Sequence, residues 1–528
     1  MTCLFLRLHR LFVCSLLERG TFMEYSIFEQ IQNAVTKEGR LPEDFRLPDE
    51  APDNQIKFAP GAMDGIIFYH MAAQSEDSEE YPLLVNAINV AAEGRIDEAI
   101  DLIYEFASKY HILGFIDLFQ QYIQENQDRL PVENIINFAI DLMLKGTKIE
   151  AVKFGMSLLE LIDLEGQEQI KDAVRLLALS DEFTLYAAFL MRSWENPNKE
   201  LFDILQKVEG WGRVHLVRMI EADSDVIEEW LVRNGVHNDV VPAYSGLDCF
   251  EKVHYLERIQ NMTLDLKDYR GLADILDAML DEGPVVGISA LENADEVMQA
   301  FFAATKNRTD LEAQDYVSLI DLRDYIQDKD GESVAALKEA LTLFLQSKQI
   351  KETIQCALEK GEAFEIARRL GMDYQEYAYR AVAEDFVKNA WIASLLIKDD
   401  YKVQEIIDLA YDKLHVEEIA TGAADETGFG EKFETHQALT MILQVLRDRI
   451  HVGENLIHPA LKSPVVSNRN VALSVLEAWM NASGKTIQEI SPTLAKSLED
   501  GLQDEVREDI RERIEKILNN CVAQTTSN

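Results

Sequence analysis

The apolar positions of this chain recur at helical spacing for most of its length. In residues 95–107, the side chains of Ile96, Ala99, Ile100 and Ile103 fall on one helix face, in the i, i+3, i+4, i+7 pattern. The same spacing returns in four further segments, residues 112–123, 132–144, 149–162 and 170–179. Helices of this length with short linkers between them favour antiparallel helical hairpins.

Two joints between these helices are alike. EGRIDEAI at residues 93–100 and KGTKIEAV at residues 145–152 each place a Gly five residues before an Ala. We expect the Gly to end one helix in a left-handed conformation, and the Ala to let the next helix approach closely. KGEAFEIA at residues 360–367 is a looser third copy. These joints resemble those of tetratricopeptide repeats, but the regular 34-residue signature is absent.

The last hundred residues carry the most regular pattern, which predicts amphipathic helices at residues 433–446, 463–479 and 506–518. The expected inward positions are Ala438, Met441, Ile442 and Val445, then Ala472, Val475, Leu476 and Trp479, then Ile510, Ile514 and Ile517. The first members of successive sets are 34 and 38 residues apart, and Arg469 and Arg507 open the later two helices. This region resembles HEAT-type repeats, which bury their apolar faces only by stacking.

These patterns predict an all-α fold, an irregular α-solenoid of helical hairpins with HEAT-like repeats at the C-terminus. Only residues 284–288 show a β-branched cluster, which is too short to carry a sheet. We divide the chain into an N-terminal extension at residues 1–22, a helix with a Pro-rich loop and a loop-helix junction at 23–80, a helical-hairpin array at 81–420, a mobile Gly-rich linker or hinge at 421–430, and HEAT-like repeats at 431–528.

The first 22 residues differ in charge from the rest, with a net +2 against −45 for the remainder. The apolar run at residues 11–17 is too short to span a membrane. Glu18 and Arg19 stand where a secretory signal needs small cleavage-site residues. We therefore expect translation to start at Met23, which opens a stretch whose composition matches everything downstream.

The composition is that of a folded, strongly acidic protein, with 47% hydrophobic residues, a net charge of −43 and a pI near 4.6. Such a field repels phosphate backbones and anionic membranes, so nucleic acid is excluded as a partner. No long apolar segment predicts membrane insertion. The five cysteines are scattered without a CxxC pair, which favours a reducing, cytoplasmic location.

The first candidate site is the loop-helix junction at residues 58–70. Gly61 and Gly65 would let the backbone approach a ligand closely, and Asp64 and His70 could supply an acid/base pair or a metal contact. The alternative is structural: Asp64 caps the free N–H groups of the helix, and His70 packs at a half-buried position.

The second candidate site is GFGEKFETH at residues 428–436, in which Glu431, Glu434 and His436 could line a polar pocket. The glycines lack a preceding strand and a P-loop Lys, so a nucleotide site is not indicated. In the alternative, the two acids stabilise a helix N-terminus through its dipole.

A third segment, residues 227–244, could present Trp230, His237 and Tyr244 as a recognition surface or bury them in an inter-helix junction. No HExxH, GxSxG, kinase or haem-attachment motif occurs, so we assign no catalytic, cofactor-binding or metal-binding residue and expect no cofactor.

Three strings, FAPGAMDGIIFYH, IEEWLVRNGVHNDVVPAY and FGEKFETHQAL with SPVVSNRNVAL, resemble a family of cytosolic helical proteins from low-GC Gram-positive bacteria that often carry the label limonene hydroxylase. The resemblance spans most of the chain from residue 23 onward. It implies a bacterial cytosolic protein and, through the label, an oxidoreductase whose site is assembled from distant helices.

Our leading hypothesis from the sequence is a non-enzymatic, acidic helical-repeat protein that binds a protein or peptide partner in the groove of its array. The alternative is the oxidoreductase that the family label implies. The sequence leaves the oligomeric state and the identity of the partner open.

Overall fold

The computed structural model describes residues 25–48, 58–71, 78–261 and 263–519 of the 528-residue chain. The expectations for residues 1–22 and for Met23, and part of the Pro-rich loop, lie outside these residues. Within them every regular element is a helix, and the only β pairing is an isolated bridge between Glu426 and Val465. The all-α prediction is therefore confirmed. No helix of this described part combines the length and apolarity needed to cross a bilayer.

The helices form two compact units, one of Met1–Arg308 with Asp324–Val334 and the other of Thr309–Arg323 with Ala335–Asn528. The division falls inside the segment 81–420 that the sequence pattern treats as one array. It passes through two helices, α18 (Val317–Ile326) and α19 (Glu332–Leu345).

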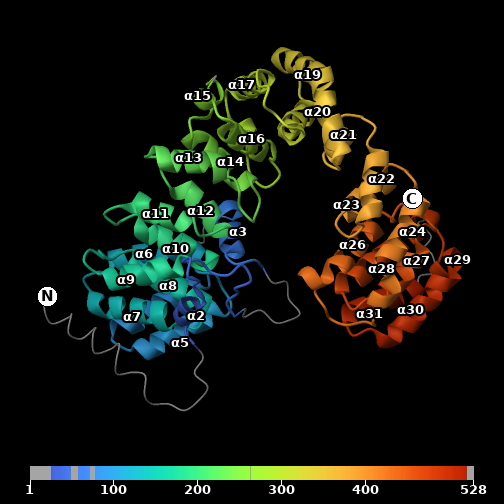
Figure 1. Cartoon of the computed structure of the whole chain (residues 1–528). Coiled ribbons are helices and arrows are strands. Elements are labelled where there is room, and N and C mark those ends of the chain that lie inside the picture. The colour runs from blue at the N-terminus through green and yellow to red at the C-terminus, as the bar shows by residue number, and fades with distance from the viewer. Residues whose placement is uncertain (1–24, 49–57, 72–77, 262, 520–528) are drawn as a thin grey trace, which may run out of the picture. The chain divides into compact units, whose positions relative to one another are not determined.

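Unit 1 is a series of helices in which most, apart from α2 and α3, pack mainly against close neighbours in the sequence (Figure 1). α7 packs against α8, α8 against α10, α10 against α12, and α12 against α14. The helices of this unit are α2 (Ile27–Ala34), α3 (Ala62–His70), α4 (Tyr81–Ala92), α5 (Ile96–Ala107), η1 (Leu113–Phe115), α6 (Ile116–Glu125), α7 (Val132–Lys145), α8 (Ile149–Leu159), α9 (Glu168–Leu177), α10 (Asp181–Met191), α11 (Pro197–Leu205), α12 (Trp211–Met219), α13 (Asp225–Asn234), α14 (Ala243–Lys252), α15 (Tyr255–Ile259), α16 (Leu266–Leu280), η2 (Ile288–Ala290) and α17 (Ala294–Lys306).

Unit 2 is a second series, in which α22 packs against α23, α23 against α26, α26 against α28, and α28 against α31. Its helices, besides most of α18 and α19, are η3 (Ala313–Tyr316), α20 (Lys348–Glu359), α21 (Phe364–Arg369), α22 (Gln375–Glu384), α23 (Ala390–Lys398), α24 (Val403–Lys413), α25 (Val416–Ile419), η4 (Glu431–Phe433), α26 (Glu434–Gln444), α27 (Glu454–Ala460), α28 (Val466–Ser483), α29 (Ile487–Ile490), α30 (Pro492–Asp504) and α31 (Glu508–Asn519).

The two similar joints use their glycines differently. Gly94, between α4 and α5, has the expected left-handed conformation, with φ of 82°. Gly146, between α7 and α8, is extended, with φ of −60° and ψ of 137°, so the left-handed prediction is wrong there. A Cβ at Gly146 would lie 2.4 Å from the carbonyl oxygen of Leu142. This glycine is therefore required by close packing and not by its backbone angles.

The apolar pattern of the C-terminal region largely predicts its core. The second and third inward sets are fully or almost fully buried, and so are Ala438 and Ile442 of the first. Met441 is wrong as an inward residue, because it is 42% exposed. Three helices between the predicted ones, α27, α29 and α30, were not anticipated.

The Gly-rich segment at residues 421–430 has no helix, and its backbone is bound to the loop before α28. The N–H of Gly422 donates to the carbonyl of Lys462 (2.9 Å), and the N–H of Val466 donates to the carbonyl of Glu426 (3.0 Å). These bonds hold the segment within unit 2.

Candidate functional sites

The first candidate helix, α3, places Asp64 in a buried cluster of charges in unit 1. Nζ of Lys153 on α8 lies 2.7 Å from Oδ2 of Asp64, 3.0 Å from Oε1 of Glu150 and 3.0 Å from Oε2 of Glu182 on α10. The side chains of Asp64 and Lys153 are each 2% exposed. We call Asp64, Glu150, Lys153 and Glu182 the Lys153 cluster; it sets three carboxyl groups around one ammonium.

Hydrogen bonds extend the cluster toward the surface and into the core. The hydroxyl of Tyr186 donates to Oδ1 of Asp64 (3.0 Å). On the other side, Oε2 of Glu150 accepts the backbone N–H of Ile112 (2.7 Å), and its Oε1 accepts Nδ1–H of His111 (3.2 Å). The His111 side chain is partly exposed. These hydrogen bonds and ion pairs therefore connect the protein surface with a buried carboxyl group.

The unequal charges shift the proton affinities of the cluster. Burial raises the pKa of Asp64 to about 6, and the nearby Glu150 and Glu182 carboxylates add to the rise, against the opposing effect of Lys153. Burial alone would raise the pKa of Glu150, but Lys153, His111 and the Ile112 N–H outweigh it and lower the pKa to about 2. The hydrogen bond to Glu150 raises the pKa of His111.

The other end of α3 packs into an aromatic group instead. The ring of Tyr69 lies 5.0 Å from that of Tyr244 and 6.1 Å from that of Trp211. His70 is exposed, and its Nε2 lies 2.8 Å from the hydroxyl of Tyr244. The structure thus separates Asp64 from His70, and the predicted acid/base pair is wrong. The structural alternative is wrong as well, because Gly61 caps α3 without a side-chain bond and His70 is not half-buried.

The second candidate site lies beside a real hollow in unit 2. Residues of α26 and of the 385–388 turn border a hollow of about 440 Å³ that is open to solvent, lined by Asp385, Val387, Lys388, Glu434, Gln437, Ala438 and Met441. We call this the α26 hollow. Of the predicted residues, Glu434 lines it, Glu431 is exposed one turn earlier in η4, and His436 is buried on the opposite side of the helix.

His436 belongs to a polar network that fixes α26 to α28. Its Nδ1–H donates to Oδ1 of Asn468 (2.9 Å), and Nδ2–H of Asn468 donates back to the His436 carbonyl (2.8 Å). The hydroxyl of Ser463 donates to the same Oδ1 (2.9 Å). His436 therefore does not line a pocket with the two acids; it positions the helix that carries Glu434.

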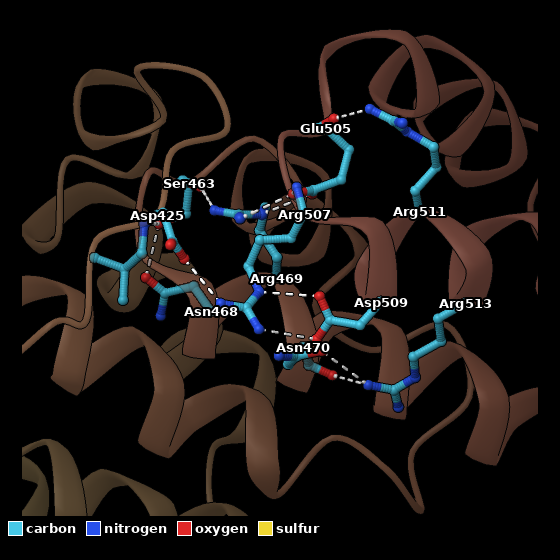
Figure 2. A network of polar contacts seen from close by, with 11 residues as sticks. Asp425, Ser463, Asn468, Arg469, Asn470, Glu505, Arg507, Asp509, Arg511 and Arg513 are labelled. Carbon is cyan, nitrogen blue, oxygen red and sulfur yellow. Dashed lines mark hydrogen bonds and ion pairs between the residues drawn. The ribbon is translucent and has the colours of Figure 1, made fainter. Parts of the chain in front are cut away.

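The same network continues to a buried ion pair, drawn in Figure 2. The guanidinium of Arg469 donates to both carboxylate oxygens of Glu505 (2.9 and 3.0 Å) and to the carbonyl of Ser463 (2.7 Å). Arg469 is 1% exposed and Glu505 2%. We call His436, Ser463, Asn468, Arg469 and Glu505 the Arg469 network.

Arg507, which the sequence pattern equates with Arg469, lies at the edge of this network and precedes α31. It is partly exposed and binds Asp425 (3.0 Å) and Asp509 (3.0 Å) (Figure 2). The two arginines are therefore not equivalent: one is buried and the other holds the 421–430 segment at the surface.

The third candidate group does not form one surface. Trp230 packs under the guanidinium of Arg213, His237 pairs with Asp274 (2.9 Å), and Tyr244 joins His70 in the aromatic group. The hydrogen bond to Asp274 raises the pKa of His237.

Sequence reasoning missed Lys153, Glu150, Glu182 and the 385–388 side of the α26 hollow. A signal for the first two was present, since Glu150 and Lys153 interrupt a helix whose other positions are almost all apolar. All residues from Glu150 to the end of α8 are buried, so both charges had to find partners inside. Among the residues described, no three His, Cys, Asp or Glu side chains are arranged to hold a metal ion.

Comparison of the sequence with protein-family models finds no match, and comparison with curated proteins finds none.

Proposed function

We propose that this protein is a cytoplasmic, acidic helical-repeat scaffold, an irregular α-solenoid, that binds a peptide segment of another protein in the α26 hollow. The observation that carries the proposal is the hollow itself, in which apolar and charged side chains lie together. One side of the hollow is α26, whose buried face is held by the Arg469 network. Its volume of about 440 Å³ lies within the usual range for ligand-binding cavities. The Arg469 network fixes α26 to α28, so the α26 side of the lining is positioned before a partner binds.

The lining indicates the chemistry of the partner. Val387, Ala438 and Met441 give an apolar surface, and methionine adapts to apolar side chains of different shapes. Asp385 and Glu434 supply two carboxylates against the single ammonium of Lys388. The net charge of −43 adds long-range attraction for cations. The partner segment is therefore basic and amphipathic, with an apolar side chain in the hollow and Lys or Arg beside it.

Exposed apolar residues next to the hollow extend this surface. Phe429 is 79% exposed, and the carbonyl of its neighbour Gly428 accepts Nε2–H of Gln437, a residue of the hollow (2.9 Å). The 421–430 segment is thereby held against α26. A peptide lying along the hollow would reach Phe429 as a second apolar contact, which is typical of a peptide-binding surface.

The test measures binding of fluorescent basic amphipathic peptides to the full chain by polarisation. Each peptide is compared with a scrambled version of the same composition that lacks the apolar stripe. Met441→Glu should weaken binding roughly tenfold or more, because it places a charge in the apolar contact. The double variant Asp385→Asn, Glu434→Gln should weaken it less and flatten its salt dependence.

The matched control is Leu343→Glu, which changes an exposed apolar residue of α19 in the same unit, 67% exposed and outside the hollow. It should bind like the unmodified chain. Equal binding by the Met441 and Leu343 variants would contradict the proposal. A stoichiometric flavin or haem absorbance in the purified protein would support the oxidoreductase alternative instead.

A further inference from the structure

The helix α3 is not built to be stable on its own. It has nine residues, it contains Gly65, and its N-cap residue is Gly61, which provides no side-chain cap and has a φ of 74°. Isolated helices of this length are marginal in water, and glycine lowers helix stability further. Its helical form therefore depends on the surface beneath it, made by η1, α8, α10, α12 and α14.

The two glycines fit that surface closely. A Cβ at Gly65 would lie 2.3 Å from ring atoms of Trp211, and one at Gly61 would lie 2.6 Å from the backbone oxygen of Asp181. The ring of Tyr69 then packs against Trp211 and Tyr244, whose own rings also contact each other. The contact has the features of a peptide seated in a receptor: small residues where the backbone touches, and aromatic side chains as anchors.

The polar contacts of α3 are, by contrast, incompletely satisfied. Asp64 is one of three carboxyl groups around the ammonium of Lys153. If Asp64 leaves, Lys153 still has Glu150 and Glu182 as partners. The rings of Phe68 and Tyr69 lie against His215 of α12, whose two ring nitrogens are buried and have no hydrogen-bond partner. Release of α3 would let water reach these groups and would leave Lys153 paired.

We propose that α3 is a displaceable intramolecular ligand, and that the face it covers is a second peptide-binding site, in unit 1. The site takes a short helix of the pattern Gly-x-x-Asp-Gly-x-x-x-Tyr, as in residues 61–69. The carboxylate of such a helix binds Lys153 and Tyr186, its second glycine lies on Trp211, and its aromatic residue enters beside Tyr244. In the folded chain, residues 58–71 occupy the site and block it. This proposal is independent of the α26 hollow.

The experiment removes α3 from its site in the full chain and then supplies residues 58–71 as a separate peptide. In the full chain, Gly65→Ala should expel α3, because the added methyl group collides with Trp211. A fluorescent peptide of residues 58–71 should then bind this variant at least roughly tenfold more tightly than it binds the unmodified chain, where the site is occupied. The same peptide carrying Asp64→Asn should bind the variant roughly tenfold more weakly, and one carrying Gly65→Ala should not bind.

Gly501→Ala is the matched control, since Gly501 lies within α30 and an added Cβ there meets nothing within 4 Å. It should behave like the unmodified chain. A folded Gly65→Ala variant that does not bind the peptide would overturn the proposal. Equal binding to the variant and to the unmodified chain would overturn it too, since the peptide would then bind elsewhere.

If Gly65→Ala fails to fold, hydrogen exchange of the unmodified chain tests whether α3 opens independently of the core. The amides of α3 should exchange at least roughly tenfold faster than those of α8 and α10, through an opening that leaves the latter two protected. Equal protection of the three helices would show that α3 is an inseparable part of the core, and the proposal would fail.

Discussion

The two buried charge clusters of this protein differ in balance. In the Lys153 cluster of unit 1, three carboxyl groups share one ammonium, and the pKa of Asp64 is raised to about 6. In the Arg469 network of unit 2, one guanidinium faces one carboxylate with two parallel bonds, and a third goes to a backbone carbonyl. A balanced pair with bidentate geometry fixes two segments permanently. An unbalanced cluster can lose one carboxyl group and still keep its cation paired.

This difference separates the two proposals. The Arg469 network supports a hollow that is preformed on a rigid helix. The Lys153 cluster, in contrast, tolerates the departure of α3 and its Asp64. Four sets of substitutions test whether the balance of charge controls the rigidity of α26 and the release of α3.

The largest effect is expected for Lys153→Met, which removes the cation shared by the buried carboxyl groups of Asp64 and Glu150 and the partly exposed one of Glu182. We expect a loss of about 3–5 kcal/mol in the free energy of unfolding of unit 1 at pH 7, measured by urea denaturation. The loss should shrink toward pH 5, because the Asp64 carboxyl group, whose pKa is raised to about 6, takes up a proton in the folded state. Lys145→Met, at an exposed lysine of α7, is the control and should lose less than about 1 kcal/mol. A similar small loss for Lys153→Met would contradict the importance of the cluster.

Arg469→Leu should destabilise unit 2 by about 3–5 kcal/mol, because Glu505 remains buried without its partner. The double variant Arg469→Leu, Glu505→Leu should lose much less, since two apolar side chains replace the pair. Urea denaturation of the two single variants and the double variant gives the coupling energy. Additive losses would show that the two side chains act independently, against the description of a balanced pair.

The pH dependence of stability should differ between the unmodified chain and Asp64→Asn. The folded-state pKa of Asp64, about 6, is above its ordinary value, so its contribution is largest at low pH and is lost as pH rises through 6. The stability of the unmodified chain relative to Asp64→Asn should therefore grow by about 1 kcal/mol from pH 7 to pH 5. Burial lowers the pKa of His215 to about 3 and acts in the opposite direction, but this effect is common to both proteins and cancels.

The smallest effect is expected for Arg507→Ala. Its side chain is 37% exposed and that of Asp425 is 66% exposed, so solvent and salt weaken their pairing. We expect a loss of less than about 1 kcal/mol that decreases further at 1 M salt, by the same denaturation measurement. A loss as large as that of Arg469→Leu would show that burial does not set the contribution of these two arginines to stability.

The sequence pattern predicts helices and their buried faces better than it predicts sites. The sequence predicts a loop leading into a helix at residues 58–70, and Asp64 is a candidate because a carboxyl group beside glycines could act as an acid or base or contact a metal. Its partner Lys153 was missed because Glu150 and Lys153, three residues apart, look like an ordinary surface ion pair. His436 was grouped with Glu434 on sequence proximity, but the two residues leave α26 on different faces.

The sequence by itself determined the all-helical class, the positions of many helices and most of their buried faces, because these depend on spacing within a single turn or two of chain. Only the tertiary structure decided that Gly146 is extended, that Met441 borders a hollow, and that Asp64 meets Lys153. The last two depend on contact between helices far apart in the sequence, and the first on close packing at the joint between α7 and α8. The 3.6-residue period identifies which side of a helix is buried, but it carries no information about which other helix covers that side.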